Sequence, residues 1–154
     1  MILLDTSVLA AVFGRRPKGV PEPRAVAAVR EMLREDAPLG IPGVVLQDVL
    51  SGVRDGAQVG RLRELLEGFP ILTAEPRHHV EAARIARVCR HRGLRPSAGH
   101  CLISALAADR EALLFTLDES FVRMAPHCGV RLFGVGEASE GPRRRHVIKG
   151  RHHG

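Results

Sequence analysis

Two aspartates follow short apolar segments at opposite ends of the chain, in positions where carboxylates could do chemistry. Asp5 comes directly after the segment MILL, and Thr116 and Asp118 follow the segment ALLF. Continuous apolar runs of this length are typical of strands that a parallel sheet buries on both faces. Sites in such sheets lie beyond the carboxyl ends of the strands. We therefore expect Asp5 and Asp118 to meet at one edge of the sheet if their strands are neighbours.

A third carboxylate, Asp48, lies in the segment VVLQDVLSGVRDG, whose apolar residues recur with the period of a helix. Two or three carboxylates at one edge can hold Mg²⁺ or Mn²⁺, hard cations that prefer oxygen ligands. A pair of such ions about 4 Å apart can activate water and stabilise the leaving oxygen of a phosphodiester. The alternative is structural: Asp5 and Asp118 would cap the helices that follow them, and Asp48 would be a solvated acid beside Arg54.

The segments that must position these acids alternate between predicted strands and predicted helices. The apolar runs predict strands at 1–5, 38–42, 70–73, 112–116 and 130–135. Apolar residues at helical spacing predict helices at 5–13, 24–36, 44–56, 57–69, 76–93, 98–110 and 118–126. This alternation predicts an α/β fold with a central, mostly parallel sheet between helical layers.

The composition limits the function classes that fit. The chain has 154 residues with five Phe and no Trp or Tyr, which disfavours a protein that reads RNA by stacking bases on aromatic side chains. The net charge is +6, but residues 141–154 carry five basic residues (Arg and Lys) and no acid. The basic charge therefore belongs to the end of the chain. We predict one folded domain over 1–136 and a basic, disordered tail over 137–154.

The remaining composition signals concern the cellular compartment. Cys89, Cys101 and Cys128 form no CxxC pair, which favours free, buried thiols in a reducing environment, with Cys101 in the core. The N-terminal segment lacks the basic region of a signal peptide, and no apolar run reaches the roughly 20 residues that span a membrane. We therefore expect a cytoplasmic protein with no membrane association. His78 and His79 fit no metal-binding pattern and are assigned no site.

Four segments of the chain, taken together and in this order, resemble the PIN domain and most closely its VapC-type toxin branch. They are LLDTSVLAAVF, VVLQDVLSG, PSAGHCLISALA and LLFTLDESFVRMA, and the resemblance covers residues 1 to about 135. It implies a three-layer α/β/α sandwich that cleaves RNA with Mg²⁺ or Mn²⁺. It also implies a homodimer that a small VapB-like antitoxin inhibits.

The resemblance carries over to individual residues. Asp5 matches the first acid of the family, with Thr6 and Ser7 as its usual hydroxyl neighbours. Asp48 stands where the family has its second acid, usually Glu, and its side chain is one bond shorter. Asp118 matches the acid after the fourth strand, and Thr116 matches the hydroxyl residue that precedes it. The resemblance thus implies a metal site of Asp5, Asp48 and Asp118, with a supporting set of Thr6, Ser7, Thr116 and Ser120.

Two positions depart from the family pattern, and both replace an acid. His100 stands where PIN domains place a further catalytic acid, and Ser120 stands where many members have another Asp. His100 removes one negative charge from the site. The pocket could then keep one metal ion on the three aspartates, take a softer divalent ion with His100 as a ligand, or bind without cleaving. His100 could also simply hydrogen-bond near its helix start.

We favour a weakened but metal-dependent ribonuclease in which His100 modifies the catalytic site. The alternative is a degenerate PIN fold that binds RNA or an antitoxin-like partner without cleaving. A phosphohydrolase of the haloacid dehalogenase type also begins with an Asp after a strand. That family places a second Asp two residues later, where this chain has Ser7.

A nuclease needs cations that hold the phosphate backbone near its acids. The loop that follows the first helix supplies the preferred candidates, which are Arg15, Arg16 and Lys18. A basic stripe on the helix at 76–93 is a weaker candidate, because such stripes are often only solvated faces; its members are Arg84, Arg87, Arg90 and His91.

Overall fold

The computed structural model describes residues 1–134, so the predicted tail at 137–154 lies outside the described residues. Five parallel strands form one sheet in the order β3-β2-β1-β4-β5. The strands are β1 (Ile2–Leu4), β2 (Leu39–Pro42), β3 (Ile71–Leu72), β4 (Leu113–Phe115) and β5 (Arg131–Leu132). The central strand β1 pairs with β4, so the strands that precede Asp5 and Asp118 are neighbours, as their meeting at one edge requires.

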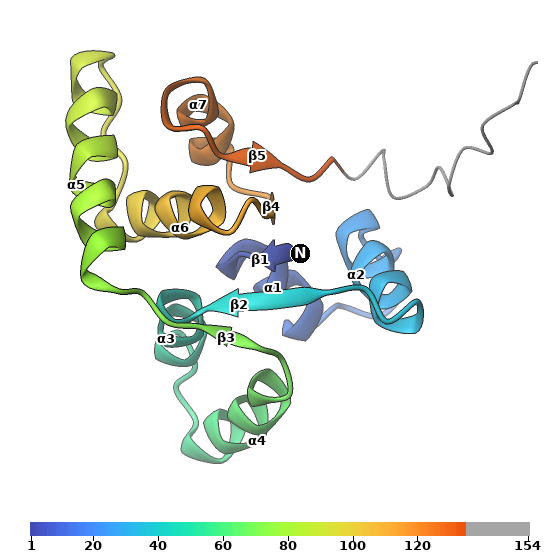
Figure 1. Ribbon diagram of the computed structural model, residues 1–154. Coiled ribbons are helices and arrows are strands. Elements are labelled where there is room, and N and C mark those ends of the chain that lie inside the picture. Colours follow the sequence, from blue (N-terminus) through green and yellow to red (C-terminus); the bar gives the residue numbers. More distant parts are fainter. Residues whose placement is uncertain (135–154) are drawn as a thin grey trace, which may run out of the picture.

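Helices connect every pair of consecutive strands. They are α1 (Thr6–Phe13), α2 (Arg24–Arg34), α3 (Gly43–Ser51), α4 (Gly56–Glu67), α5 (Pro76–His91), α6 (Ala98–Asp109) and α7 (Glu119–Cys128). Parallel strands need right-handed crossovers, and the strand order reverses direction after β3. The connections before and after that reversal therefore lie on opposite faces of the sheet, and α5, α6 and α7 gather on one side of the strands in Figure 1. The predicted three-layer α/β/α architecture is confirmed.

One predicted helix ends earlier than expected. The helix predicted at 44–56 stops at Ser51, and residues 52–55 form a short non-helical connection to α4. The backbone N–H of Gly52 closes α3 by donating to the carbonyl of Asp48. The side chain of Asp55 then accepts a hydrogen bond from the N–H of Ala57 and caps α4. The helical spacing runs through this break because a glycine and a capping aspartate leave the apolar period intact.

The core lies on both faces of the central strands. Leu3, Leu4, Leu114 and Phe115 are fully buried, which explains why β1 and β4 have continuous apolar sequences. Gly40 in β2 allows this packing, since a Cβ there would stand 2.6 Å from Cδ1 of Leu72. The strands that carry the aspartates are thus held by the most buried part of the molecule.

The three cysteines are buried and unbonded, as predicted. Cys101 is 1% exposed, and burial raises the pKa of its thiol, so it belongs to the core. Among residues 1–134, no helix combines the length and apolar character that crossing a membrane requires.

Candidate functional site

A pocket of about 290 Å³ lies at the carboxyl edge of the sheet, where α1, α3, α6 and α7 converge. Its lining includes all four residues that the sequence analysis predicts as catalytic, and the full set is Asp5, Thr6, Ser7, Asp48, Ser97, Gly99, His100, Ile103 and Asp118. The folded chain therefore brings three aspartates from distant segments into one pocket. Each is held in a different way.

Asp5 is the anchored carboxylate of the pocket. It directly follows β1, is 4% exposed, and its Oδ1 accepts the N–H of Thr6 at 2.7 Å as the N-cap of α1. Its Oδ2 accepts the hydroxyls of Ser7 at 2.8 Å and Thr116 at 2.6 Å. Three donors compensate the burial of the charge, and they fix the direction in which the carboxylate points.

Asp118 is the carboxylate from the β4 side. It is the N-cap of α7, and its Oδ1 accepts the N–H of Ser120 at 2.9 Å. Its own N–H donates to the hydroxyl of Thr116 at 3.0 Å, which links it to the Asp5 network. The Ser120 N–H holds the pKa of Asp118 below its usual value, with a smaller contribution from His100, while burial acts in the opposite direction. Asp118 is therefore charged at neutral pH.

Asp48 is the exposed member of the three. It projects from α3, which begins immediately after β2, so the sheet order sets its position at the pocket. Within residues 1–134 its carboxylate has no hydrogen-bond or ion-pair partner, so the alternative of a solvated helix acid stays open for Asp48 alone. Asp48 thus has the largest free coordination capacity in the pocket.

His100 lies in the first turn of α6 and uses both ring nitrogens. Nδ1 accepts the N–H of Ser97 at 3.3 Å, and the hydroxyl of Ser97 accepts the N–H of His100 at 3.1 Å. Nε2 lies 2.9 Å from Oδ2 of Asp118, and the ring meets Phe121 edge-on with centroids 4.9 Å apart. His100 therefore does hydrogen-bond near the helix start, and it also reaches into the acidic pocket.

The other predicted site residues are more widely placed. Ser120 contributes its backbone N–H to Asp118, but it is not part of the pocket lining. Arg16 and Lys18 are exposed on the loop after α1, and Arg15 borders a different pocket with Arg61 of α4. On α5, the basic stripe is exposed, and its Arg84 pairs with Glu81.

Three pocket residues were not singled out from the sequence, namely Ser97, Gly99 and Ile103. Ser97 had a usable signal, because a serine just before an apolar helical run is a typical N-cap. Gly99 and Ile103 had none, since only the approach of α6 to α1 and α3 makes them part of the lining.

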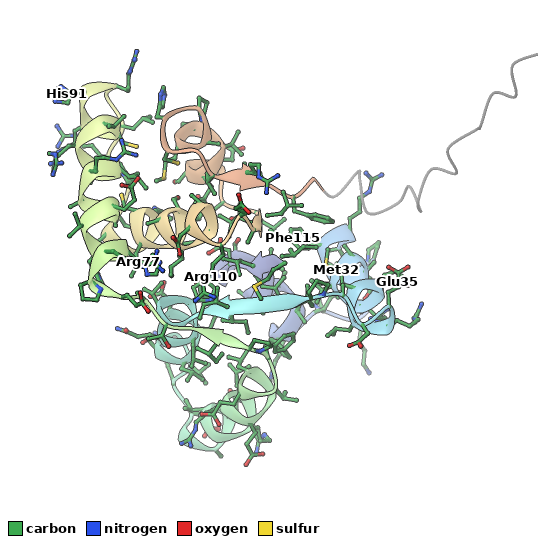
Figure 2. All side chains as sticks on the ribbon, viewed as in Figure 1. Met32, Glu35, Arg77, His91, Arg110 and Phe115 are labelled. Carbon is green, nitrogen blue, oxygen red and sulfur yellow. The ribbon has the colours of Figure 1, made fainter. Side chains whose placement is uncertain are left out.

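A second His–Asp pair has the same local geometry but lies outside this pocket. The N–H of Glu75, the N-cap of α5, donates to Nδ1 of His78 at 2.9 Å, and Nε2 of His78 lies 2.9 Å from Oδ2 of Asp109 at the end of α6. Arg77, labelled near the start of α5 in Figure 2, donates to both Asp109 and Glu75. His78 is 2% exposed and the side chain of Asp109 is 31% exposed, so this pair joins α5 to the end of α6 at the edge of the core.

The donor set of the acidic pocket fits a hard divalent cation. The three carboxylates offer oxygen ligands, and the room in the pocket allows such a cation to keep part of its water shell. In the part of the chain that the structure describes, no three His, Cys, Asp or Glu side chains already stand at metal-binding distance from one another. The fit therefore rests on the chemistry of the donors, with Asp48 as the carboxylate that has no partner among residues 1–134.

The chain is similar in sequence to one protein family and in structure to several solved proteins. Residues 2–126 match the PIN domain. FitAcB from Neisseria gonorrhoeae has a similar structure, with a TM-score of 0.67 and 22% sequence identity over 88% of this chain and 99% of that chain. VapBC-1 from nontypeable Haemophilus influenzae gives a TM-score of 0.68 and 18% identity over 88% and 99%. The sarcin–ricin loop cleaving toxin VapC20 of Mycobacterium tuberculosis gives 0.60 and 14% over 80% and 94%.

Proposed function

The chain belongs to the PIN domain family, and from this premise we propose that it is a metal-dependent endoribonuclease resembling the VapC toxins of toxin–antitoxin modules. The observation that carries the proposal is the pocket in which Asp5, Asp48 and Asp118 meet. The similarity in fold to a toxin that cleaves the sarcin–ricin loop supports RNA as the substrate. The replacement of an acid by His100 weakens the activity without abolishing it.

The three aspartates of the pocket differ in how firmly the fold holds them. Asp5 is buried and fixed by Ser7 and Thr116, so it gives the pocket one carboxylate whose direction is set. Asp118 stays ionised because the start of α7 stabilises its charge. Asp48 is exposed and closes the third side of the pocket. Rigid and adjustable carboxylates together suit a site that must accept and release a charged polymer.

Asp5, Asp48 and Asp118 would hold Mg²⁺ or Mn²⁺ in this pocket. When bound, such an ion supplies charge neutralisation at the phosphodiester and activation of a water molecule. Thr6 and Ser7 at the start of α1 help to fix Asp5, and the N–H of Ser120 fixes Asp118. The cations that hold the RNA backbone are Arg15, Arg16 and Lys18 on the loop after α1, which extends from the same helix that Asp5 caps.

The partners follow from the same proposal. The similar structures include VapBC complexes, one of them from Rickettsia felis bound to promoter DNA, and a toxin–antitoxin complex from Klebsiella pneumoniae. We infer that a small VapB-like antitoxin binds this chain and that the chain forms a homodimer in the cytoplasm. Co-expression with the product of the adjacent reading frame, followed by size-exclusion chromatography with light scattering, tests both points.

A cleavage assay tests the function directly. Labelled RNA is incubated with the full-length protein and Mg²⁺, Mn²⁺ or a chelator, beside the variant Asp118→Ala. We expect cleavage that needs the cation and is lost in the variant. Arg77→Gln is a matched control, because it removes a cation that the α5 cluster holds away from the pocket. Cleavage that persists in chelator and in Asp118→Ala would refute the proposal.

A non-cleaving PIN fold is the second candidate, and one observation favours it. Both ring nitrogens of His100 are already engaged by Ser97 and Asp118, so the residue that replaces the acid offers no free ligand atom. A fold that only binds RNA or an antitoxin would show no Mn²⁺ binding that Asp118→Ala abolishes. Calorimetric titration of Mn²⁺ into both proteins therefore separates the two candidates.

A further inference from the structure

We propose that a second pocket, which lies beside α4, binds one nucleotide of the RNA substrate a few nucleotides away from the acidic pocket. A phosphate of this nucleotide would be held by Arg15 and Arg61, and its base would rest on an apolar floor. The inference rests on the proposed function, because the ligand is part of the same RNA chain. It adds a substrate subsite to that function and assigns a role to Arg61.

The second pocket, which we call the α4 pocket, has a volume of about 310 Å³ and is formed by the end of α1, the connection after α3 and α4 itself. This volume lies at the lower end of the range of small-ligand sites, about 300–1,000 Å³. The floor of the pocket is apolar and consists of Phe13, Val53, Leu62 and Leu65. Leu65 is 57% exposed, so part of the floor is open to solvent. Apolar surface left uncovered in a hollow is typical of a place where a ligand binds.

Two cations of the α4 pocket have no counter-charge. Arg15 and Arg61 line it, and the lining contains no Asp or Glu. Neither guanidinium has an ion-pair or hydrogen-bond partner among residues 1–134, whereas Arg63, two residues further along α4, is held by Glu67. A guanidinium with free N–H donors is suited to phosphate, which it can bind through two parallel hydrogen bonds. The pocket therefore favours an anionic ligand that also has an apolar part.

The α4 pocket and the acidic pocket lie at opposite ends of α1. Thr6 and Ser7 at the start of this helix line the acidic pocket, and Phe13 at its end lines the α4 pocket. The neighbouring helix α3 packs against α1, carries Asp48 to the acidic pocket and is followed by Val53 in the α4 pocket. Since α1 has eight residues, the two pockets are about 12 Å apart along it. An RNA strand bound at the acidic pocket can span this distance with a few nucleotides.

The opposite charges of the two pockets suit different parts of such a strand. The acidic pocket holds three carboxylates and no Lys or Arg, and the α4 pocket holds two Arg and no carboxylate. A phosphodiester approaches carboxylates only together with a cation, whereas a phosphate further along the strand can be bound directly by arginine. The apolar floor adds a surface for an unstacked base. A single phenylalanine is no platform for several stacked bases, so the pocket accommodates one base, which agrees with the low aromatic content of the chain.

RNA binding in the absence of cleavage is the decisive measurement. Fluorescence anisotropy of a labelled single-stranded RNA is recorded with the full-length protein in chelator, so that no metal-dependent cleavage takes place. We expect Arg61→Gln to weaken binding about fivefold at ~0.1 M salt, because one lost phosphate contact removes about 0.7 from the slope of log K against log salt. Leu65→Ser should weaken binding about threefold, because it removes apolar surface from under the base.

Each variant has a matched control. Arg63→Gln removes a cation that Glu67 already holds on the same helix, and Leu33→Ser removes a leucine of α2 that is 53% exposed and lies outside the pocket. Both controls should bind RNA as the wild type does. Affinity that is unchanged in Arg61→Gln and Leu65→Ser, or lowered equally in the controls, would overturn the inference. If these two variants lost only the co-expressed antitoxin, the α4 pocket would be a protein-docking site, which overturns the inference as well.

A measurement on the unmodified protein covers the case in which a variant fails to fold. The common nucleoside 5′-monophosphates are titrated into the isotope-labelled protein and followed by NMR, with ribose 5-phosphate as the ligand that lacks a base. We expect the backbone signals of Phe13, Leu62 and Leu65 to shift with at least one nucleotide and to shift less with ribose 5-phosphate. No shift at these residues, or an equal shift with ribose 5-phosphate, would contradict a nucleotide subsite.

The result is separable from the proposed function. RNA binding that Arg61→Gln and Leu65→Ser weaken, in a protein that does not cleave RNA, would refute the nuclease and leave the nucleotide subsite standing. Metal-dependent cleavage with an RNA affinity that neither variant changes would refute only the subsite.

Discussion

Two helices of this protein begin with the same hydrogen-bonded motif, and only one of the two lies in the acidic pocket. In both α5 and α6 the third residue is a histidine whose Nδ1 accepts the N–H of the N-cap residue. In both, Nε2 lies 2.9 Å from an aspartate on another segment. The surroundings differ, because His78 is buried and Asp109 also binds Arg77, whereas His100 is partly exposed and Asp118 lies beside two further carboxylates. The two aspartates themselves are about equally exposed.

The hydrogen-bonded motif at the helix start therefore does not decide whether its histidine serves the fold or the pocket. Around His78 every charge has a partner, so the motif joins α5 to the end of α6 and contributes to the fold. Around His100 the side chains are 24% exposed for the histidine and 36% for Asp118, and negative charge is left uncompensated. Uncompensated charge at the open carboxyl edge of a sheet is what a ligand can use. If the two motifs differ in this way, substitutions in them should have opposite effects on activity and stability.

The largest expected effect is on RNA cleavage. Asp118→Asn removes a charged ligand from the pocket and should lower the cleavage rate at least about 100-fold, since losing even an outer partner of a metal ligand typically costs 10–100-fold. Asp109→Asn makes the same chemical change in the α5 motif and should leave the rate unchanged. Initial rates on a labelled RNA check both variants. Equal losses in the two would end the functional distinction between the motifs.

The second prediction concerns stability, for which we expect the larger loss in the α5 motif. His78→Ala removes a side chain that is 2% exposed and leaves Asp109 and the Glu75 N–H without their partner. We expect the free energy of unfolding to fall by about 1–3 kcal/mol. His100→Ala should cost about 1 kcal/mol or less, as removal of a partly exposed cap does. Urea unfolding measures both variants. A larger loss for His100→Ala would contradict the assignment of the structural role to His78.

The third prediction compares free cations with an engaged one. Arg15, Arg16 and Lys18 are exposed, whereas Arg77 is held by Glu75 and Asp109. Replacing the three loop residues by Gln should reduce the salt dependence of RNA binding, by about 0.7 in the slope of log K against log salt for each phosphate that the loop no longer neutralises. Arg77→Gln should not change the slope. Fluorescence anisotropy at several salt concentrations gives these slopes, and an unchanged slope in the triple variant would remove the loop from the binding surface.

The smallest expected effect is a pH dependence of stability at the α5 motif. His78, and then Arg77, hold the pKa of Asp109 below its usual value of 3.8 by hydrogen bonds to the carboxylate. A carboxylate with a lowered pKa stabilises the fold at pH values above its unfolded pKa, and this contribution is lost as the pH falls through the folded pKa. Asp109→Asn should therefore have a lower Tm than wild type at neutral pH, and the gap should close in acid below about pH 4. A gap of constant size from pH 7 to pH 3, measured by thermal unfolding, would contradict this origin.

Much of the architecture could be predicted from local patterns. Short apolar runs located all five strands, and helical spacing located all seven helices of residues 1–134, because burial on one or two faces leaves a periodic trace in the sequence. The predicted bounds differ from the structure by a few residues at several elements, and the largest difference for a helix is at the end of α3. There a glycine and a capping aspartate interrupt the helix without interrupting its apolar period.

The candidate site was predictable only in part. The positions of Asp5 and Asp118 directly after apolar segments indicated one edge of the sheet, and the order of the strands then brought them together. Asp48 could be named as a third carboxylate on a predicted helix, but only the resemblance to a family favoured a metal-binding role over a solvated helix acid. The lining residues Gly99 and Ile103 could not be found, since their place depends on how α6 crosses the sheet.

Local sequence specifies the side chains, the helices and strands that carry them, and the capping residues Ser97 and Asp118. The packing of distant segments places Arg77 against Asp109 beside His78, and it places His100 in a pocket with three carboxylates. This division arises because a hydrogen bond to an N-cap forms within four residues, whereas the charge around a side chain depends on the distant segments that pack against it.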